Sequence, residues 1–165
     1  MRKVYSLVCA VLCIAVASAV SMPAIQSGTI DEVVLVESIE DFIKQNPDVT
    51  VTPMNKEIPA VKAKAFGQKA PIRYTMGRLS SSDRVLSNGQ NSYYYPTLQD
   101  VKLQLSYPQS GVGGIVTYVE IIVEQSSGNG QAYIVAGRIG ERFIRIVVEA
   151  KQTSYFIYRA AFYGY

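Results

Sequence analysis

The chain has 165 residues, with sixteen lysines and arginines, thirteen acidic residues and no histidine. This length suits one domain of ordinary size, and the lack of histidine removes the commonest general base and metal ligand. Both cysteines, Cys9 and Cys13, lie in an N-terminal segment that is predicted below to be removed. The mature chain would then have no thiol nucleophile, no thiolate metal site and no disulfide.

Residues 1–19 have the pattern of a secretory signal peptide. Positively charged residues 2 and 3 precede an apolar run over 4–16, and residues 17–19 form an A-x-A cleavage motif. The apolar run is shorter than the roughly 20 residues that a transmembrane helix needs. We therefore predict secretion, a mature chain that starts at Val20 and no membrane contact after the signal is removed; a retained anchor is the alternative.

The two parts of the mature chain carry opposite charge. Residues 20–57 contain seven acidic residues and two lysines, whereas residues 58–165 contain twelve basic and six acidic residues. This asymmetry indicates an acidic leader beside a mildly basic domain. A propeptide whose acidic residues cover the basic face is the alternative.

Residues 30–44 predict a helix within the leader. Their apolar side chains recur near one helical face, Asp31 and Glu32 suit the positive end of the helix dipole, and Asn46-Pro47 ends the pattern. The run from Val33 to Val36 would also suit a strand, so both interpretations stay open.

The segment 46–70 has the composition of a linker. It contains three prolines and scattered lysines but no sustained hydrophobic period, which is typical of extended, solvated chain. Leader and linker together make up residues 20–70, and a β-domain is expected over 71–165.

After residue 71, short segments with the composition of β-strands follow one another. RYTMG, RVLSNG and SYYYP are aromatic or β-branched and end at Gly or Pro. DVKLQLSY alternates as a half-buried strand does, whereas GIVTYVEIIVEQ is apolar on both faces, as a central strand is. AYIVAG, RFIRIVVEA and SYFIYRAAFYG follow, the last two joined by KQTS. This spacing without helices predicts an all-β, antiparallel sheet packed as a sandwich or open barrel.

The stretch AGRIG, residues 136–140, suits either a phosphate loop or a β-turn. A phosphate cradle needs a helix N-terminus, but the β-branched residues that follow Gly140 favour a strand, and no dinucleotide fingerprint is present. We therefore predict a hairpin in which Gly137 and Gly140 allow positive φ. Arg138 would lie at its tip as a candidate partner contact.

Carboxylates are the remaining candidates for catalysis, because a glycosidase needs only an acid and a base or nucleophile. Glu120 and Glu124 would lie about 13 Å apart on one strand, at roughly 3.3 Å per residue, although pairing with Glu149 could shorten that separation. The simpler interpretation is that these carboxylates are solvent-facing charges on sheet edges. Calcium prefers clustered carboxylate and amide oxygens, whereas Asp83 and Asp100 are isolated in the sequence. We predict no enzymatic activity, no cofactor and no metal.

Tyrosines are abundant, with eleven in the mature chain. If Tyr93, Tyr94 and Tyr95 are extended, their side chains face both sides, so at least one is expected at the surface as a candidate partner contact. An aromatic platform for bases would need basic residues beside it, and the positive charges are too dispersed to form such a patch by sequence alone. No direct nucleic-acid binding is expected.

The C-terminal part of the chain resembles a known family. MGRLSSSDRVL (76–86), VTYVEIIVEQSSGNGQAYIVAGRIGERFIRIVVEA (116–150) and the closing FYG (162–164) resemble the insect family named after multiprotein bridging factor two. The resemblance covers about residues 73–164. The family includes many short secreted proteins, some described as salivary secreted peptides.

The resemblance is carried by a few landmarks. The first is a Gly-Arg…Asp-Arg segment, matched here by Gly77, Arg78, Asp83 and Arg84, and the second is a polar turn at residues 126–130. The third is a glycine-rich turn, matched by Gly137 and Gly140, and the fourth is a terminal Tyr-Gly, matched by Tyr163 and Gly164. Family members tend to have two adjacent glycines in the glycine-rich turn, where this chain has Arg138. The family implies no catalytic residues.

The signal peptide and the resemblance imply different functions. The signal peptide predicts a secreted, non-enzymatic insect protein that binds an unknown protein or small extracellular ligand. The founding member of the family is regarded as a transcriptional coactivator that bridges a DNA-bound regulator to the general transcription machinery. That adaptor role is the alternative.

Overall fold

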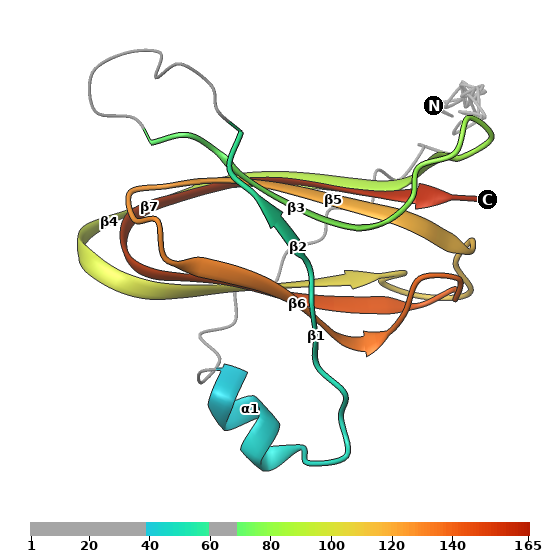
Figure 1. The fold of residues 1–165 in the computed structure, drawn as a ribbon, viewed down its shortest axis with the longest axis horizontal. Helices are drawn as coiled ribbons and strands as arrows, with labels where there is room; N and C mark the ends of the chain where they lie inside the picture. Colours follow the sequence, from blue (N-terminus) through green and yellow to red (C-terminus); the bar gives the residue numbers. More distant parts are fainter. Residues whose placement is uncertain (1–38, 60–68) are drawn as a thin grey trace, which may run out of the picture.

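The fold was examined in a computed structural model, which describes residues 39–59 and 69–165. One helix and seven strands follow in the order α1 (Ile39–Gln45), β1 (Thr52–Pro53), β2 (Asn55–Glu57), β3 (Ile72–Gly77), β4 (Arg84–Tyr107), β5 (Val116–Gln125), β6 (Gly130–Gly137) and β7 (Ile144–Gly164). Every strand pairing is antiparallel (Figure 1), so the predicted all-β class is confirmed. The predicted signal peptide lies outside the described residues.

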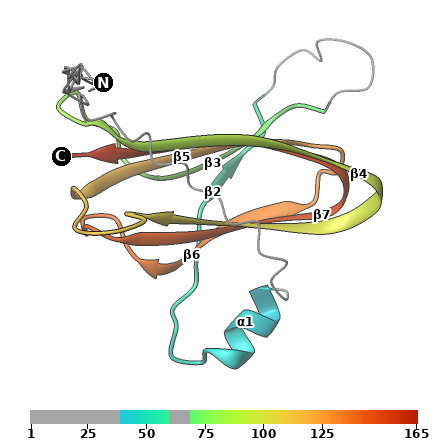
Figure 2. The same ribbon diagram turned by 180° about the vertical axis from the view of Figure 1, so that it is seen from behind.

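Strand β7 joins the two layers of the sheet. Its first half pairs with β6 and with the end of β4, and its second half pairs with β5 and with the start of β4. Because β4 and β7 both bend, the sheet folds over on itself (Figures 1 and 2). We call one layer the β5 layer (β2, β3, β5, the second half of β7 and the start of β4). The other is the β6 layer (β1, β6, the first half of β7 and the end of β4).

Irregular backbone and local polar contacts form the corner of β7. Gln152 has a φ of 53°, and its backbone N–H donates to Asp100 Oδ1 on β4 at 2.9 Å. Thr153 is fully buried, and its Oγ1 accepts a hydrogen bond from the Ser126 backbone N–H at 3.1 Å. These contacts let the strand change direction without ending, as bulges do at the corners of sandwiches.

The sequence breaks predicted inside β4 and β7 were wrong. RVLSNG, SYYYP and DVKLQLSY belong to the single strand β4, and SYFIYRAAFYG belongs to β7 together with RFIRIVVEA from Ile144 onward. Pro96 is accommodated because it lies between the paired residues Tyr94 and Gln99, where the register shifts, in a strand that pairs only with β7 among the described strands. The prediction that β5 is central is confirmed, since it lies between β3 and β7.

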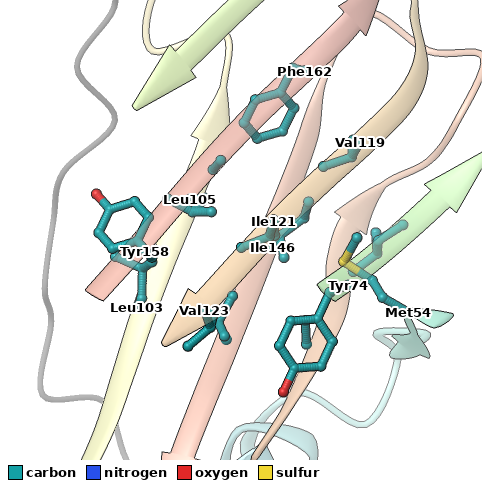
Figure 3. Close-up of a cluster of buried hydrophobic side chains, with 14 of the residues drawn as sticks. Met54, Tyr74, Leu103, Leu105, Val119, Ile121, Val123, Ile146, Tyr158 and Phe162 are labelled. Atoms are coloured by element: carbon teal, nitrogen blue, oxygen red, sulfur yellow. The ribbon is translucent and has the colours of Figure 1, made fainter. Parts of the chain in front are cut away.

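The core lies between the two layers and is supplied by alternate residues of each strand. Figure 3 shows these apolar side chains meeting: Leu103 and Leu105 from β4, Val119, Ile121 and Val123 from β5, and Ile146, Tyr158 and Phe162 from β7. All eight are at most 1% exposed. With no cysteine among the described residues, burial of this apolar surface is the main stabilising contribution.

Residues 52–57 close one side of the sandwich. β1 pairs with the edge of β6 and β2 pairs with the edge of β3, while Met54 between them is 3% exposed and its backbone N–H donates to Ala132 O at 2.9 Å. The chain thereby supplies backbone partners to two strand edges. This part of the predicted linker belongs to the sheet.

Helix α1 packs on the outer face of the β6 layer. Ile39 is buried against Val135 and Val147, and its backbone N–H donates to Glu149 Oε1 at 2.8 Å. Glu149 is itself only 3% exposed, so its carboxylate satisfies an N–H at the helix start that would otherwise be unpaired. The helix predicted over 30–44 is observed from Ile39, and the residues before it lie outside the described part of the chain.

Tyr74 on β3 has a fully buried side chain whose hydroxyl has no hydrogen-bond partner among the described residues. Burial, and to a smaller degree the proximity of Tyr133, raises the pKa of Tyr74 above its usual value. A raised pKa favours the protonated form in the folded state. Below about pH 10 the Tyr74 hydroxyl is protonated in both states, so its titration does not reduce the free energy of unfolding. Above that pH the unfolded chain releases this proton more readily than the folded protein, and the free energy of unfolding falls as the pH rises.

The substitution Tyr74→Phe should lessen this alkaline loss of stability. We expect the variant to be as stable as the wild type near pH 8, or more stable, because no hydrogen bond is removed, and to gain on the wild type between about pH 10 and 11.5. Urea unfolding at several pH values measures this difference. Tyr94→Phe, at a tyrosine that is 72% exposed, is the control. A loss above about 1 kcal/mol at pH 8 would show that the Tyr74 hydroxyl has a partner.

Candidate functional site

Three loops and the C-terminal residues meet at one end of the sandwich. We call this region the motif end and define it as residues 77–85, 108–118, 137–145 and 162–165; it lies at the end of Figure 1 where the C-terminus is marked. Backbone hydrogen bonds tie the segments together, among them Gly140 N to Val116 O at 2.7 Å and Ile115 N to Tyr165 O at 2.7 Å. Segments distant in sequence therefore form one ordered surface.

The loop between β6 and β7 is a hairpin connection, as predicted. Gly137 and Gly140 have φ values of 68° and 92°, and Ile139 between them packs against the core. A Cβ at Gly137 would lie 2.1 Å from Phe143 O. The connection extends beyond the predicted turn at Gly137–Gly140, because β7 begins only at Ile144. A strand follows the glycines, so the helix N-terminus required by the phosphate-loop interpretation is absent from this described segment.

Arg138 is exposed in this loop, as predicted. Its side chain is 80% exposed, and its Nε donates to Glu141 Oε1 at 2.7 Å. An exposed ion pair of this kind contributes little to stability. Its main effect is to occupy the Glu141 carboxylate.

The loop between β3 and β4 carries the Gly-Arg…Asp-Arg landmark. Gly77 has a φ of 84°, and a Cβ there would lie 2.1 Å from Thr117 O. The Asp83 carboxylate accepts the Ser80 backbone N–H at 2.8 Å, and the Asp83 N–H donates to Ser80 O at 3.1 Å, which closes the turn. Arg78 and Arg84 flank this turn and are both exposed.

The terminal Tyr-Gly landmark is held against the start of β5. The Tyr163 ring packs against the Tyr118 ring, with centroids 5.7 Å apart. Gly164 is buried so closely that a Cβ would lie 1.8 Å from Ile115 O. Tyr165 follows and is 62% exposed. The close approach of backbone to backbone accounts for glycine at position 164.

The loop between β4 and β5 is held by contacts from the end of β4 and from the loop between β6 and β7. The Gly114 N–H donates to the Tyr107 hydroxyl at 2.7 Å, and Arg142 Nη1 donates to Gly113 O at 2.9 Å. Val112 lies at the tip and is 87% exposed. The guanidinium of Arg145 lies over the Phe143 ring, 5.7 Å from its centroid, which fixes two exposed side chains relative to each other.

The surface of the motif end combines arginine with exposed apolar side chains. It holds five arginines, two acidic residues and no lysine. Nine large hydrophobic residues are exposed in the described chain, and five of them lie here: Leu79, Val85, Val112, Phe143 and Tyr165. Sequence reasoning did not single out these five. Val112 stands alone among glycines and serines in SGVGG, which is a signal that could have identified it.

The structure does not bring the sequence-predicted contacts together. Arg138 lies at the motif end, whereas Tyr94 is ten residues along β4 from Arg84, or about 33 Å at roughly 3.3 Å per residue. Tyr94 is 72% exposed, while Tyr93 and Tyr95 pack partly against the core, so the expectation of at least one exposed tyrosine is confirmed. The polar-turn landmark at 126–130 lies at that far end too, between β5 and β6.

The carboxylates considered for catalysis are separated. Glu120 pairs with Arg73 at 2.5 Å, and Glu124 approaches Arg159 at 3.9 Å. Glu149 is registered with Lys102 and Gln131 in the β6 layer, so the proposed cross-strand approach to Glu120 or Glu124 does not occur. Within the described ranges, no three side chains of His, Cys, Asp or Glu are grouped so that they could hold a metal ion.

An open depression of about 540 Å³ crosses the outer face of the β5 layer. Gly89, Ala160 and Ala161 lie among its lining residues, with Glu120 and Arg159 beside them. Both charged side chains are already paired within the protein.

In the part of the chain that the structure covers, no helix has the length and apolar character needed to cross a membrane.

The landmark glycine at 164 provides a direct test of this architecture. Gly164→Ala should destabilise the domain by about 1–3 kcal/mol or more, because the added Cβ meets a backbone carbonyl that cannot rotate away. Gly128→Ala is the matched control, since a Cβ there meets nothing within 4 Å. Urea unfolding of both variants measures the effect. Equal stability of the two variants would contradict the packing described at Gly164.

Comparison with known proteins gives one result. A family model described as "Transcription activator MBF2" matches residues 76–164. No curated protein matches the chain, and no solved structure matches it. The matched range begins at the end of β3 and includes every segment of the motif end except Tyr165. The chain therefore belongs to the MBF2 family.

Proposed function

We propose that the chain is a non-enzymatic binding module that contacts another protein through the motif end. The observation that carries this proposal is the concentration of exposed apolar side chains on loops whose backbones are fixed by hydrogen bonds. Exposed apolar residues that are clustered rather than scattered are typical of interaction sites. Fixed loops also lose little conformational entropy when a partner binds.

The state of the acidic groups supports binding rather than catalysis. Asp83 closes a turn with Ser80, Glu141 pairs with Arg138, and Glu120 pairs with Arg73. A general acid or base must be free to exchange a proton with a substrate. In these three places the carboxylate is engaged with a neighbour in the protein.

We further propose that the module acts in extracellular fluid. The support is the signal-peptide pattern of residues 1–19: positive charge, an apolar run and an A-x-A motif. The description of the MBF2 family as a transcription activator favours a second candidate, an adaptor between a DNA-bound regulator and the general transcription machinery. The two candidates place the same kind of binding surface in different compartments.

The compartment can be tested with the full chain carrying a C-terminal tag in insect cells. We expect the protein to accumulate in the medium, with an intact mass that corresponds to a chain starting at Val20. The double variant Val8→Asp with Leu12→Asp interrupts the apolar run of the signal peptide and should stay inside the cell. Nuclear retention of the unmodified protein would contradict secretion and support the adaptor.

The binding surface can be tested by cross-linking the tagged protein in extracellular fluid and in nuclear extract. The double variant Leu79→Ser with Val112→Ser should lose most of the captured protein, because both side chains are exposed at the motif end. Tyr94→Ser with Leu98→Ser is the control, since it removes two exposed apolar side chains from the bend of β4. Equal losses from both double variants would contradict a partner site at the motif end.

A further inference from the structure

We propose that the motif end recognises an acidic segment of the partner protein, one that carries apolar side chains between its carboxylates. This inference rests on the proposed binding function and adds the chemistry of the partner. Three observations carry it: the arginines without acidic partners, the spacing set by the strand register, and the exposed apolar residues at the same end of the sandwich.

The first observation is an unbalanced set of guanidinium groups. The five arginines of the motif end are Arg78, Arg84, Arg138, Arg142 and Arg145. Within residues 39–59 and 69–165, Arg78 and Arg84 have no acidic group within 4 Å, and both acidic residues of this end are engaged locally. Arginine is the side chain best suited to binding carboxylates through two parallel hydrogen bonds.

The second observation is the distance between the two exposed arginine positions. Gly77, Tyr118, Tyr163 and Val85 are in register across β3, β5, β7 and β4. Three strand spacings of about 4.8 Å place Gly77 about 14 Å from Val85, and Arg78 and Arg84 adjoin these two residues. An extended chain covers that distance in about four residues. Carboxylates four positions apart in an extended segment therefore match the two arginines.

The third observation separates an acidic protein segment from a nucleic acid. Aliphatic side chains of Leu79, Val85 and Val112 are exposed among the arginines, at 51%, 51% and 87%. Sugar and phosphate offer these side chains no apolar complement, and single-stranded binding relies on aromatic platforms. Two aromatic side chains are also exposed at this end: Tyr165, and Phe143, whose ring already contacts the Arg145 guanidinium within the protein. Leucine or phenylalanine side chains between carboxylates would fit this surface.

The experiment uses the intact purified protein and short fluorescein-labelled probe peptides of about eight residues, long enough to extend past the 14 Å row. One peptide repeats the pattern Glu-Ser-Leu-Ser twice, so that glutamates four positions apart and the leucines between them face the same side of an extended chain. A second peptide has glutamine in place of glutamate, and an oligothymidine of similar length is the third probe. We expect the glutamate peptide to bind at least tenfold more tightly than either other probe. Its affinity should fall as NaCl is raised, because salt screens exposed charges.

The double variant Arg78→Glu with Arg84→Glu should weaken binding of the glutamate peptide at least tenfold. Arg159→Glu with Lys151→Glu is the matched control, since it makes the same change in net charge at exposed positions outside the motif end and should change the affinity less than twofold. Arg78→Gln with Arg84→Gln serves as a second, milder variant if charge reversal disturbs folding. Thermal unfolding followed by circular dichroism verifies that each variant is folded.

Four outcomes would overturn the proposal: no preference for the glutamate peptide, tighter binding of oligothymidine, equal loss in the matched control, or preferred binding of a peptide with this chain's own residues 30–38. The last outcome would assign the site to the acidic leader of the protein itself. If the cross-linking experiment succeeds while the glutamate peptide fails, the binding module stands and only the acidic chemistry is wrong. If the cross-linking also fails, the proposed function fails with it.

Discussion

Strand β7 runs through both layers of this domain, as β4 does, and it is the strand with which β4, β5 and β6 all pair; the rest of the structure depends on that arrangement. Its two halves provide the partner for β6, for β5 and for both halves of β4. The inward residues of β7 therefore contribute to the core from both sides, with Ile146 in one layer and Phe162 in the other. The corner at Gln152 and Thr153 makes this possible, because it turns the strand while local hydrogen bonds replace the interrupted ladder. A sandwich is thereby built from one continuous sheet.

The same arrangement explains why the family landmarks are separated in sequence but adjacent in space. β7 ends beside the start of β5 and the start of β4, so Tyr163 and Gly164 meet the segments that begin at Val116 and Arg84. Gly77 ends β3 and Gly137 ends β6, and both have positive φ. The Gly77 backbone approaches Thr117 O, and the Gly137 backbone approaches Phe143 O, too closely for a side chain. Most landmarks thus hold the loops in place, and the exposed arginines and apolar residues lie on the surface that results. The glycines therefore have structural roles, and the proposed recognition depends on the side chains beside them.

Local patterns predicted the all-β class, the central strand β5 and the hairpin at Gly137 and Gly140, because each depends on residues close together in sequence. Ile121 and Val123 alternate with outward residues, and the β-branched residues after Gly140 favour a strand over a helix. The long strands were missed because the corner depends on Asp100 and Gln152, which meet only after β4 and β7 have paired. β1 and β2 were missed because two or three residues are too few to show a period. Of the partner contacts predicted from the sequence, only Arg138 lies at the motif end. Arg78 and Arg84 were identified as family landmarks, but their grouping with the other arginines follows from cross-strand register rather than from spacing along the chain.

The position of β7 at residues 144–164 also determines when the domain can form during synthesis. β4, β5 and β6 are made first, yet each has its main partner in β7, the last of the described strands. β5 can pair with β3 and β6 with β1 before then, but the edges that β7 covers stay unpaired until β7 has been made, and the pairings then formed join residues far apart in sequence. Folding of this kind is slow, and open strand edges favour association between nascent chains. The stage before β7 pairs is therefore the one at which this chain is most exposed to association with other chains.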